Sequence, residues 1–219
     1  MDSLERLRPE RELVIVYAGP RGAGKSTNLK ALARRQGQTF ERSLCLERGA
    51  LRGVALRWRV EIAAEGAAGE RALAEADGVV YVCRSRADEL AGLRALLATY
   101  AERPALERPP IVVQANMQDV AGALGPRAVL EAAGAPLLVI PAIASEGRGV
   151  ESTLRVLIHE CTERLRARFA TPATGVPAAA RRPRTSTPAL GVPAVPTTAE
   201  RAPAVKVFQE EDTSAAKVS

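Results

Sequence analysis

The chain has 219 residues, of which 47% are hydrophobic and only 3% aromatic, and its formal net charge is +6. This length suits one α/β domain with some residues to spare, and its core must be built mainly from Ala, Leu and Val. Basic residues are interspersed with acidic ones and form no stripe with interleaved aromatics, so the composition argues against a nucleic-acid-binding protein.

The N-terminal residues, MDSLERLRPERE, are charged and lack the apolar segment of a signal peptide. We interpret residues 1–11 as an N-terminal extension. No apolar run in the sequence approaches the ~18 residues that a membrane-spanning helix needs. Cys45, Cys83 and Cys161 show no CxxC spacing, which is typical of buried thiols in a reducing compartment. We therefore expect a soluble cytoplasmic protein without a membrane span.

Residues 12–169 alternate strand-like and helix-like segments, which is the signature of an α/β layer fold. The first strand is ELVIVYA at 12–18, and the first helix, at 25–35, follows a glycine-rich loop. RSLCLERG and VALRWRVEIA, on either side of a turn at 50–53, predict an antiparallel hairpin. Every other residue of the second run is apolar, and Trp58 shares that apolar face, so we expect it in the core.

Three short apolar runs, each bounded by Gly, Pro or a charged residue, have the character of central parallel strands. They are GVVYVC at 78–83, PIVVQA at 110–115 and PLLVIP at 136–141. The remaining segments predict helices at about 67–76, 87–102, 126–133 and 148–168. Together these elements predict a single α/β domain at 12–169.

The composition changes after this domain, and we expect residues 170–219 to form a disordered tail. Seven of the fifteen prolines lie there, mixed with Ala, Thr and Ser, and TPATGVPA recurs as TPALGVPA. Such a segment buries too little apolar surface to offset the loss of chain entropy on folding. Two interpretations stay open, a flexible tether and a low-complexity segment without a function.

The stretch GPRGAGKS matches the phosphate-binding pattern G-x-x-x-x-G-K-[ST] and lies between the first strand and the first helix. In such a loop the glycines let the backbone wrap around phosphates, and successive N–H groups converge on the anion at the helix N-terminus. We expect Lys25 to reach the β- and γ-phosphates and the Ser26 hydroxyl to ligate Mg²⁺. The predicted phosphate site comprises Gly19, Pro20, Arg21, Gly22, Ala23, Gly24, Lys25, Ser26 and Thr27.

Two later loops resemble the base-recognition loops of Ras-like GTPases. Asn116-Met117-Gln118-Asp119 follows a strand at the place where those proteins carry N/T-K-x-D, whose Asp accepts two hydrogen bonds from guanine. PAIASEGRGV follows the next strand and resembles the loop whose backbone N–H recognises guanine O6, with Ala144 at the matching position. The predicted base site comprises Asn116, Met117, Asp119, Ala144 and Ser145.

Four segments together resemble the bacterial small GTPases of the MglA type, which act in gliding motility and cell polarity. They are VIVYAGPRGAGKSTNLKAL, DGVVYV, IVVQANMQDV and PAIASEGRGVESTLRVL, and the similarity covers about residues 12–168. The resemblance implies a Ras-like P-loop domain, with a mostly parallel six-stranded sheet, one antiparallel hairpin strand and helices on both faces. It also implies GTP or GDP and Mg²⁺ as ligands, and partners such as a roadblock-type activating protein and response-regulator-like effectors.

Four positions depart from the Ras-like pattern. The segment 36–53 is too short for a full switch I loop, and Thr39 is its only threonine. The Asp of the second metal-side motif falls on Ala63, in Ala-Ala-Glu-Gly, and the Gln that positions the attacking water falls on Ala67. The Lys of the guanine motif is Met117. Because positioning and electrostatic stabilisation supply most phosphoryl-transfer catalysis, these losses predict very slow hydrolysis.

The sequence therefore leaves three hypotheses. The first is a guanine-nucleotide-binding regulatory protein with weak or absent intrinsic GTP hydrolysis. The second is an active GTPase switch, assisted by a partner that supplies an Arg or a Gln in trans. The third is a P-loop small-molecule kinase or an ATPase, against which stand the guanine-type loops and the lack of an Arg-rich lid segment.

Overall fold

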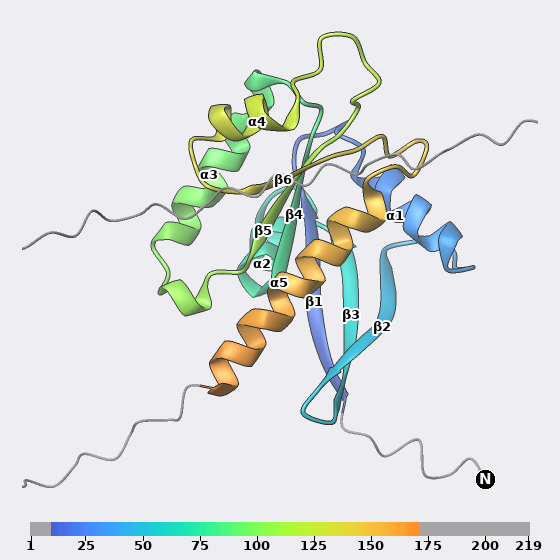
Figure 1. Ribbon diagram of the computed structural model, residues 1–219, viewed down its shortest axis with the longest axis vertical. Coiled ribbons are helices and arrows are strands. Elements are labelled where there is room, and N and C mark those ends of the chain that lie inside the picture. The colour runs from blue at the N-terminus through green and yellow to red at the C-terminus, as the bar shows by residue number, and fades with distance from the viewer. Residues whose placement is uncertain (1–9, 171–219) are drawn as a thin grey trace, which may run out of the picture.

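The structure is a computed structural model that describes residues 10–170 (Figure 1). The first strand, β1, begins at Glu10, whose register partner is Ala55, and the last helix, α5, ends at Ala170. Of the predicted N-terminal extension at 1–11, residues 1–9 lie outside the described residues, whereas Glu10 and Arg11 belong to β1. Of the predicted tail at 170–219, residues 171–219 lie outside them, and Ala170 is the last residue of α5.

Six strands form one sheet in the order β2-β3-β1-β4-β5-β6 (Figure 1). Every neighbouring pair is parallel except β2 and β3, which form the predicted antiparallel hairpin. The mostly parallel α/β sheet expected from the sequence is therefore confirmed. The strands are β1 Glu10–Ala18, β2 Ser43–Leu51, β3 Val54–Ile62, β4 Gly78–Cys83, β5 Ile111–Ala115 and β6 Leu138–Pro141.

Helices cover both faces of the sheet and bury two separate hydrophobic clusters. One cluster holds apolar residues of α1 and α5, and the other holds those of α3 and α4, with Leu73 of α2 packed against it. The helices are α1 Lys25–Arg35, α2 Ala67–Glu75, α3 Ala91–Ala101, α4 Pro126–Ala133 and α5 Val150–Ala170. The helix predicted at 87–102 begins with a separate 3₁₀ turn, η2 (Ala87–Leu90), and another, η3 (Ala105–Glu107), precedes β5. Each helix of the described part is too short or too polar to cross a bilayer.

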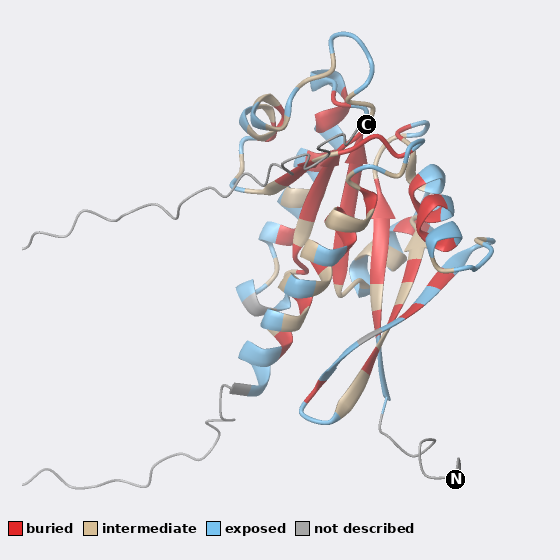
Figure 2. Cartoon of the chain, turned by 45° about the vertical axis from the view of Figure 1, so that its right-hand side comes forward, coloured by how far each residue is buried: buried red, intermediate tan, exposed pale blue. Residues whose placement is uncertain are grey.

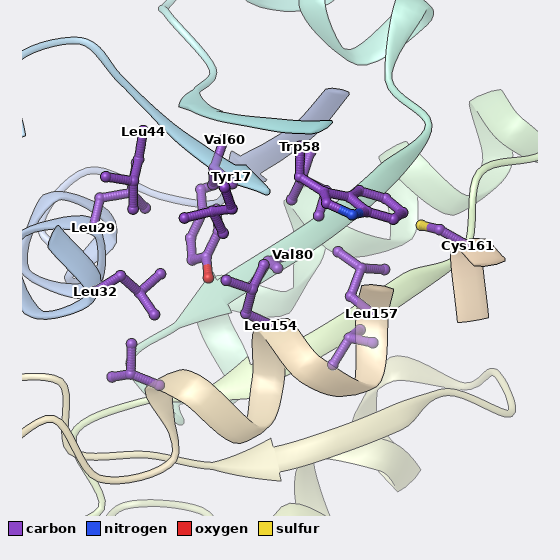
Figure 3. Close-up of a cluster of buried hydrophobic side chains, with 14 of the residues drawn as sticks. Tyr17, Leu29, Leu32, Leu44, Trp58, Val60, Val80, Leu154, Leu157 and Cys161 are labelled. Carbon is purple, nitrogen blue, oxygen red and sulfur yellow. The ribbon is translucent and has the colours of Figure 1, made fainter. Parts of the chain in front are cut away.

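Alternation along the hairpin decides which of its side chains enter the core. Leu56, Trp58 and Val60 of β3 are buried, which confirms the core position predicted for Trp58. Trp58 packs near Leu157 and Cys161 of α5 (Figure 3). Buried residues concentrate along the central strands, whereas the outer surfaces of the helices are exposed (Figure 2). Cys83 and Cys161 are buried, but the expectation of a buried thiol is wrong for Cys45, because the alternation of β2 turns it outward.

The parallel strands end together at one edge of the sheet, where the loops after β1, β3, β4, β5 and β6 meet. The loop after β1 contains the predicted phosphate residues, and the loops after β5 and β6 contain the predicted base residues. In open parallel sheets, ligands bind beyond the carboxyl ends of the strands. The topology thus places both predicted halves of the site at the same edge.

Candidate functional site

The loop between β1 and α1 lies so close to the neighbouring strands that two of its glycines have no room for a side chain. A Cβ on Gly19 would lie 2.0 Å from the Val82 carbonyl oxygen, and one on Gly24 would lie 2.2 Å from Asn116 Nδ2. Both glycines also have positive φ, 128° and 100° respectively. The glycine-rich motif is therefore required by the approach of this loop to β4 and to the end of β5.

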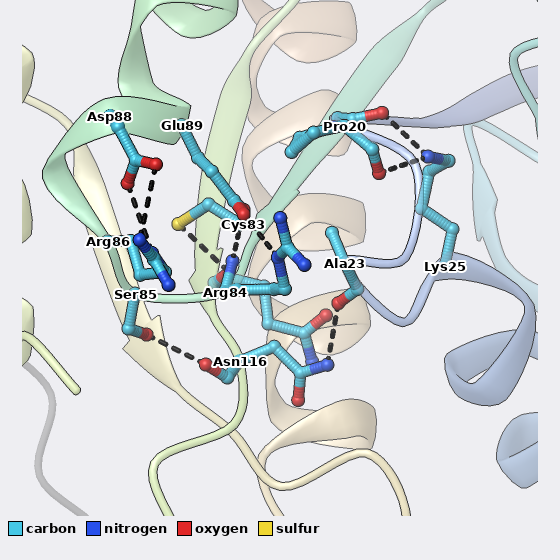
Figure 4. A network of polar contacts seen from close by, with 12 residues as sticks. Pro20, Ala23, Lys25, Cys83, Arg84, Ser85, Arg86, Asp88, Glu89 and Asn116 are labelled. Carbon is cyan, nitrogen blue, oxygen red and sulfur yellow. Dashed lines mark hydrogen bonds and ion pairs between the residues drawn. The ribbon is translucent and has the colours of Figure 1, made fainter. Parts of the chain in front are cut away.

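Lys25, the first residue of α1, turns its side chain back over the loop (Figure 4). Its ammonium donates hydrogen bonds to the carbonyl oxygens of Gly19, at 2.6 Å, and Pro20, at 2.8 Å. Burial lowers the pKa of Lys25, and the nearby charge of Glu65 opposes that shift. A cation is thus held at the N-terminus of a helix, where the helix dipole already favours an anion.

Asn116 links its own loop, which follows β5, to the loops that follow β1, β4 and β6. Its Nδ2 donates to the Ala23 carbonyl at 2.8 Å, and its Oδ1 accepts from the Ala144 N–H at 2.9 Å. Its backbone carbonyl accepts from Ser85 Oγ at 2.8 Å. Asn116 is only 2% exposed, so these bonds fix the phosphate loop against both predicted base loops in a dry environment.

The predicted base residues differ in exposure and in whether their polar groups already have a hydrogen-bond partner. The Ala144 N–H, which we expected to recognise guanine O6, already donates to Asn116, whereas the Ser145 N–H makes no hydrogen bond to any residue between 10 and 170. Asp119 is exposed, and Met117 adopts a left-handed backbone with φ 61°. The loop is held by Gln118, whose amide donates to Ser85 Oγ at 2.7 Å and to the Leu124 carbonyl at 3.0 Å.

An open cavity of about 920 Å³ lies between the phosphate loop, the end of β3, and η2 with α3. Eight of the nine predicted phosphate residues line it, and Ala23 is instead buried beneath the loop. Ile62, Ala63, Ala64 and Glu65 form the facing wall, and the remaining wall comprises Leu73, Tyr81, Asp88, Glu89, Gly92 and Leu96. The structure therefore brings the Ala63 position, which a metal-side Asp would occupy, to the same cavity as Lys25 and Ser26. The five base residues do not line this cavity.

Two positions that catalysis would need bring no functional group to the cavity. Thr39 is exposed on the loop between α1 and β2 and does not line the cavity. This loop runs only from Gln36 to Arg42. Ala67 is the first residue of α2 and carries no polar atom on its side chain. Within residues 10–170, no group of three or more His, Cys, Asp or Glu side chains could hold a metal ion.

Sequence reasoning missed a buried polar pair beneath the loop. Gln114 of β5 donates from Nε2 to Asn28 Oδ1 at 2.8 Å, and Asn28 Nδ2 donates to the Gly24 carbonyl at 2.9 Å. Both residues are completely buried. A glutamine inside the apolar run IVVQA was the available signal, because a buried amide needs a partner.

No family model and no curated protein matches this sequence. Among solved structures, the chain is similar to the Arl6 (BBS3) small GTPase from Trypanosoma brucei, whose structure contains the nucleotide analogue GppNp. The two sequences are 18% identical, the match covers 70% of this chain and 99% of that chain, and the TM-score is 0.53. This similarity shows that the chain has the fold of a small Ras-like GTPase.

Proposed function

We propose that the chain is a guanine-nucleotide-binding regulatory protein of the Ras-like type, with weak or absent intrinsic GTP hydrolysis. The observation that carries this proposal is the position of Asn116, which joins the phosphate loop to both loops that would hold the base. A P-loop alone would fit many nucleotide enzymes. Its attachment to an Asn-x-x-Asp loop and to the loop after β6 favours guanine.

The residues at the site fit a nucleoside diphosphate or triphosphate. The glycine loop and the start of α1 form a cradle for phosphates, and Lys25 exchanges its two loop carbonyls for phosphate oxygens. Exposed Asp119 accepts from guanine N1–H and the 2-amino group. The Ser145 N–H, in place of that of Ala144, donates to guanine O6.

The same residues fit Mg²⁺ only in part. Ser26 lines the cavity and supplies a hydroxyl ligand, but Ala63 offers no carboxylate where the second metal-side group would stand. Glu65, two residues further on, is the carboxylate of that segment that lines the cavity. A loosely held metal ion and the absence of a water-positioning side chain at Ala67 both reduce the rate of hydrolysis.

The open cavity favours a second candidate function, a GTPase completed by a partner. Glu65 and Ala67 are exposed at the start of α2, beside the phosphate loop, so a partner can bring an Arg or a Gln to the γ-phosphate. The resemblance to the MglA type points to a roadblock-type activating protein and to effectors of a bacterial polarity or motility pathway.

Titration with fluorescent GDP, GTP and ATP analogues, with and without Mg²⁺, tests the proposal. We expect Lys25→Ala to weaken binding by about 10- to 100-fold, because it removes charge-assisted hydrogen bonds to phosphate. Lys30→Ala is the matched control, since Lys30 is exposed on the same helix and should leave affinity unchanged. Asp119→Ala should reduce the preference for guanine over adenine more than it reduces phosphate affinity.

Single-turnover hydrolysis then separates the candidate functions. Tight guanine binding without turnover supports the nucleotide-binding regulator, and turnover that appears only with a partner supports the assisted GTPase. A preference for ATP, or unchanged binding in Lys25→Ala, would show that the proposed function is wrong.

A further inference from the structure

Arg84, the first residue after β4, places its guanidinium beside the phosphate loop (Figure 4). Its Nη1 atom lies 3.9 Å from the position that a Cβ on Gly22 would occupy. Neither Nη group of Arg84 donates a hydrogen bond to a residue of the described part of the chain. The side chain is 43% exposed, so these donors are open to a ligand that sits on the loop.

Glu89 of η2 holds this arginine in place. One carboxylate oxygen of Glu89 accepts from the Arg84 backbone N–H at 2.9 Å, and the other accepts from the Arg84 Nε–H. The Glu89 side chain is only 5% exposed and lines the same cavity as Lys25. Because the carboxylate binds Nε and leaves both Nη groups free, it orients the guanidinium without using the donors that face the loop.

The loop after the neighbouring strand β5 lacks the lysine of the Ras-like guanine motif, which gives the position of Arg84 its interest. Cys83 and Ala115 are register partners, so Arg84 follows β4 beside the start of the Asn116–Asp119 loop. In that loop, Met117 stands where the Ras-like guanine motif carries a lysine. Arg84 is therefore a cation at the end of the strand next to the one whose loop lacks the motif's lysine.

We propose that Arg84 is a nucleotide-binding residue that contacts the phosphate chain from the β4 side, and that Glu89 is its positioning residue. This inference rests on the proposed guanine-nucleotide binding and adds to it a second cation beside the phosphate loop. A guanidinium fits the role, because its planar fork of donors matches phosphate oxygens.

The test compares fluorescent GDP binding by the full chain and by Arg84→Gln, at a temperature well below the unfolding midpoint of each protein. We expect Arg84→Gln to weaken binding by about tenfold or more, as the loss of a charge-assisted contact to phosphate does. Added NaCl should narrow the difference between the two proteins, because salt screens an exposed charge interaction. Arg86→Gln is the matched control, since Arg86 is exposed and paired with Asp88 at 3.2 Å.

Two further variants separate binding from folding. Arg84→Gln leaves the buried Glu89 carboxylate without its cation, so the double variant with Glu89→Gln restores a neutral hydrogen-bonded pair. We expect the double variant to fold and still to bind GDP as weakly as Arg84→Gln. Glu89→Gln alone should weaken binding by a smaller factor, because the arginine remains but is no longer held by a charge.

The outcomes distinguish a failure of the Arg84 inference from a failure of the proposed guanine-nucleotide binding. If the wild-type chain binds GDP and both Arg84 variants bind it within twofold of wild type, Arg84 serves only to neutralise Glu89 and the inference is wrong. A loss of thermal stability without a change in affinity has the same meaning. If the wild-type chain binds no guanine nucleotide, the proposed function fails and the inference fails with it.

Discussion

At the scale of single residues, the lysine of the phosphate loop shows how the site is prepared for an anion. Lys25 is partly buried, and its ammonium is satisfied by two carbonyl oxygens of its own loop. Neutral carbonyls compensate the charge less well than phosphate oxygens do, which agrees with the lowered pKa of Lys25. An arriving phosphate therefore meets a cation that gains from the exchange of partners.

This arrangement predicts that nucleotide binding takes up protons at alkaline pH. Burial lowers the pKa of Lys25 in the free protein, so the side chain is partly neutral in a range below the ordinary pKa of a lysine. Phosphate favours the charged form and raises the pKa again, so affinity should fall as pH rises through this range. Calorimetry of GDP binding in two buffers of different ionisation enthalpy measures the uptake, and Lys30→Ala should leave it unchanged. A binding enthalpy that does not depend on the buffer would contradict the prediction.

The lowered pKa of Lys25 also affects the free energy of unfolding, which should rise with pH where the affinity falls. The unfolded chain binds the Lys25 proton more tightly than the folded chain does, so the lysine destabilises the fold while both states are protonated. As pH rises from the lowered pKa toward the ordinary lysine value, this penalty is relieved. The site therefore holds a charge at some cost to the free energy of unfolding, as is common where function needs a partly buried ion.

At the scale of elements, the β2–β3 hairpin depends on its two-residue turn. Arg52 and Gly53 both have positive φ, 51° and 82°, which is the conformation that tight hairpin turns require. Arg52 tolerates this backbone while its guanidinium lies 5.7 Å from the Phe169 ring centre and donates to the Phe169 carbonyl at 3.2 Å. The tip of the hairpin is thereby attached to the end of α5.

We predict that Gly53→Ala lowers the free energy of unfolding by about 1–2 kcal/mol, the cost of a left-handed backbone for a residue with a Cβ. A Cβ at this position would meet no atom within 4 Å, so the effect would come from the backbone alone. Gly125→Ala is the control, because Gly125 is equally open but has a φ of −64°, and the effect of alanine at this N-cap of α4 should stay below about 1 kcal/mol. Urea denaturation of both variants checks the prediction, and equal effects would disprove it.

The sequence predicted most elements because their patterns are local. Continuous apolar runs identified β4, β5 and β6, and alternation with Trp58 on the inward face identified the hairpin. The turn and the start of the third predicted helix, at 87–102, were less well placed. Arg52 and Leu90 sit in conformations that tertiary contacts select, since Arg52 meets Phe169 and Leu90 is completely buried. No local pattern contains that information.

At the scale of the whole molecule, the sequence predicted the loops of the candidate site but could not supply the contacts between them. The motif gave Lys25 and Asn116 by spacing alone, whereas the contact of Asn116 with Ala144 depends on how β5 and β6 pair. Arg84 belongs to no motif, and its role emerges only when β4 is packed beside the phosphate loop. Residues that act through long-range packing are thus the part of the site that sequence reasoning misses.

A single variant of Asn116 tests whether the attachment of the phosphate loop to the loops after β5 and β6 matters for stability and binding. In Asn116→Ala, the Ala23 carbonyl and the Ala144 N–H both lose their partner. Each buried polar group left without a hydrogen bond costs about 1–3 kcal/mol, so we expect the free energy of unfolding to fall by about 2–5 kcal/mol. GDP affinity should fall as well, because the phosphate loop is no longer fixed to the loops that hold the base.

The control is Asp119→Ala. Asp119 is exposed on the same loop, so this variant should change the free energy of unfolding by less than about 0.5 kcal/mol. If Asn116→Ala lost stability but bound GDP as tightly as the wild type, the three loops would be independent, and the site would not require the tie that this residue makes.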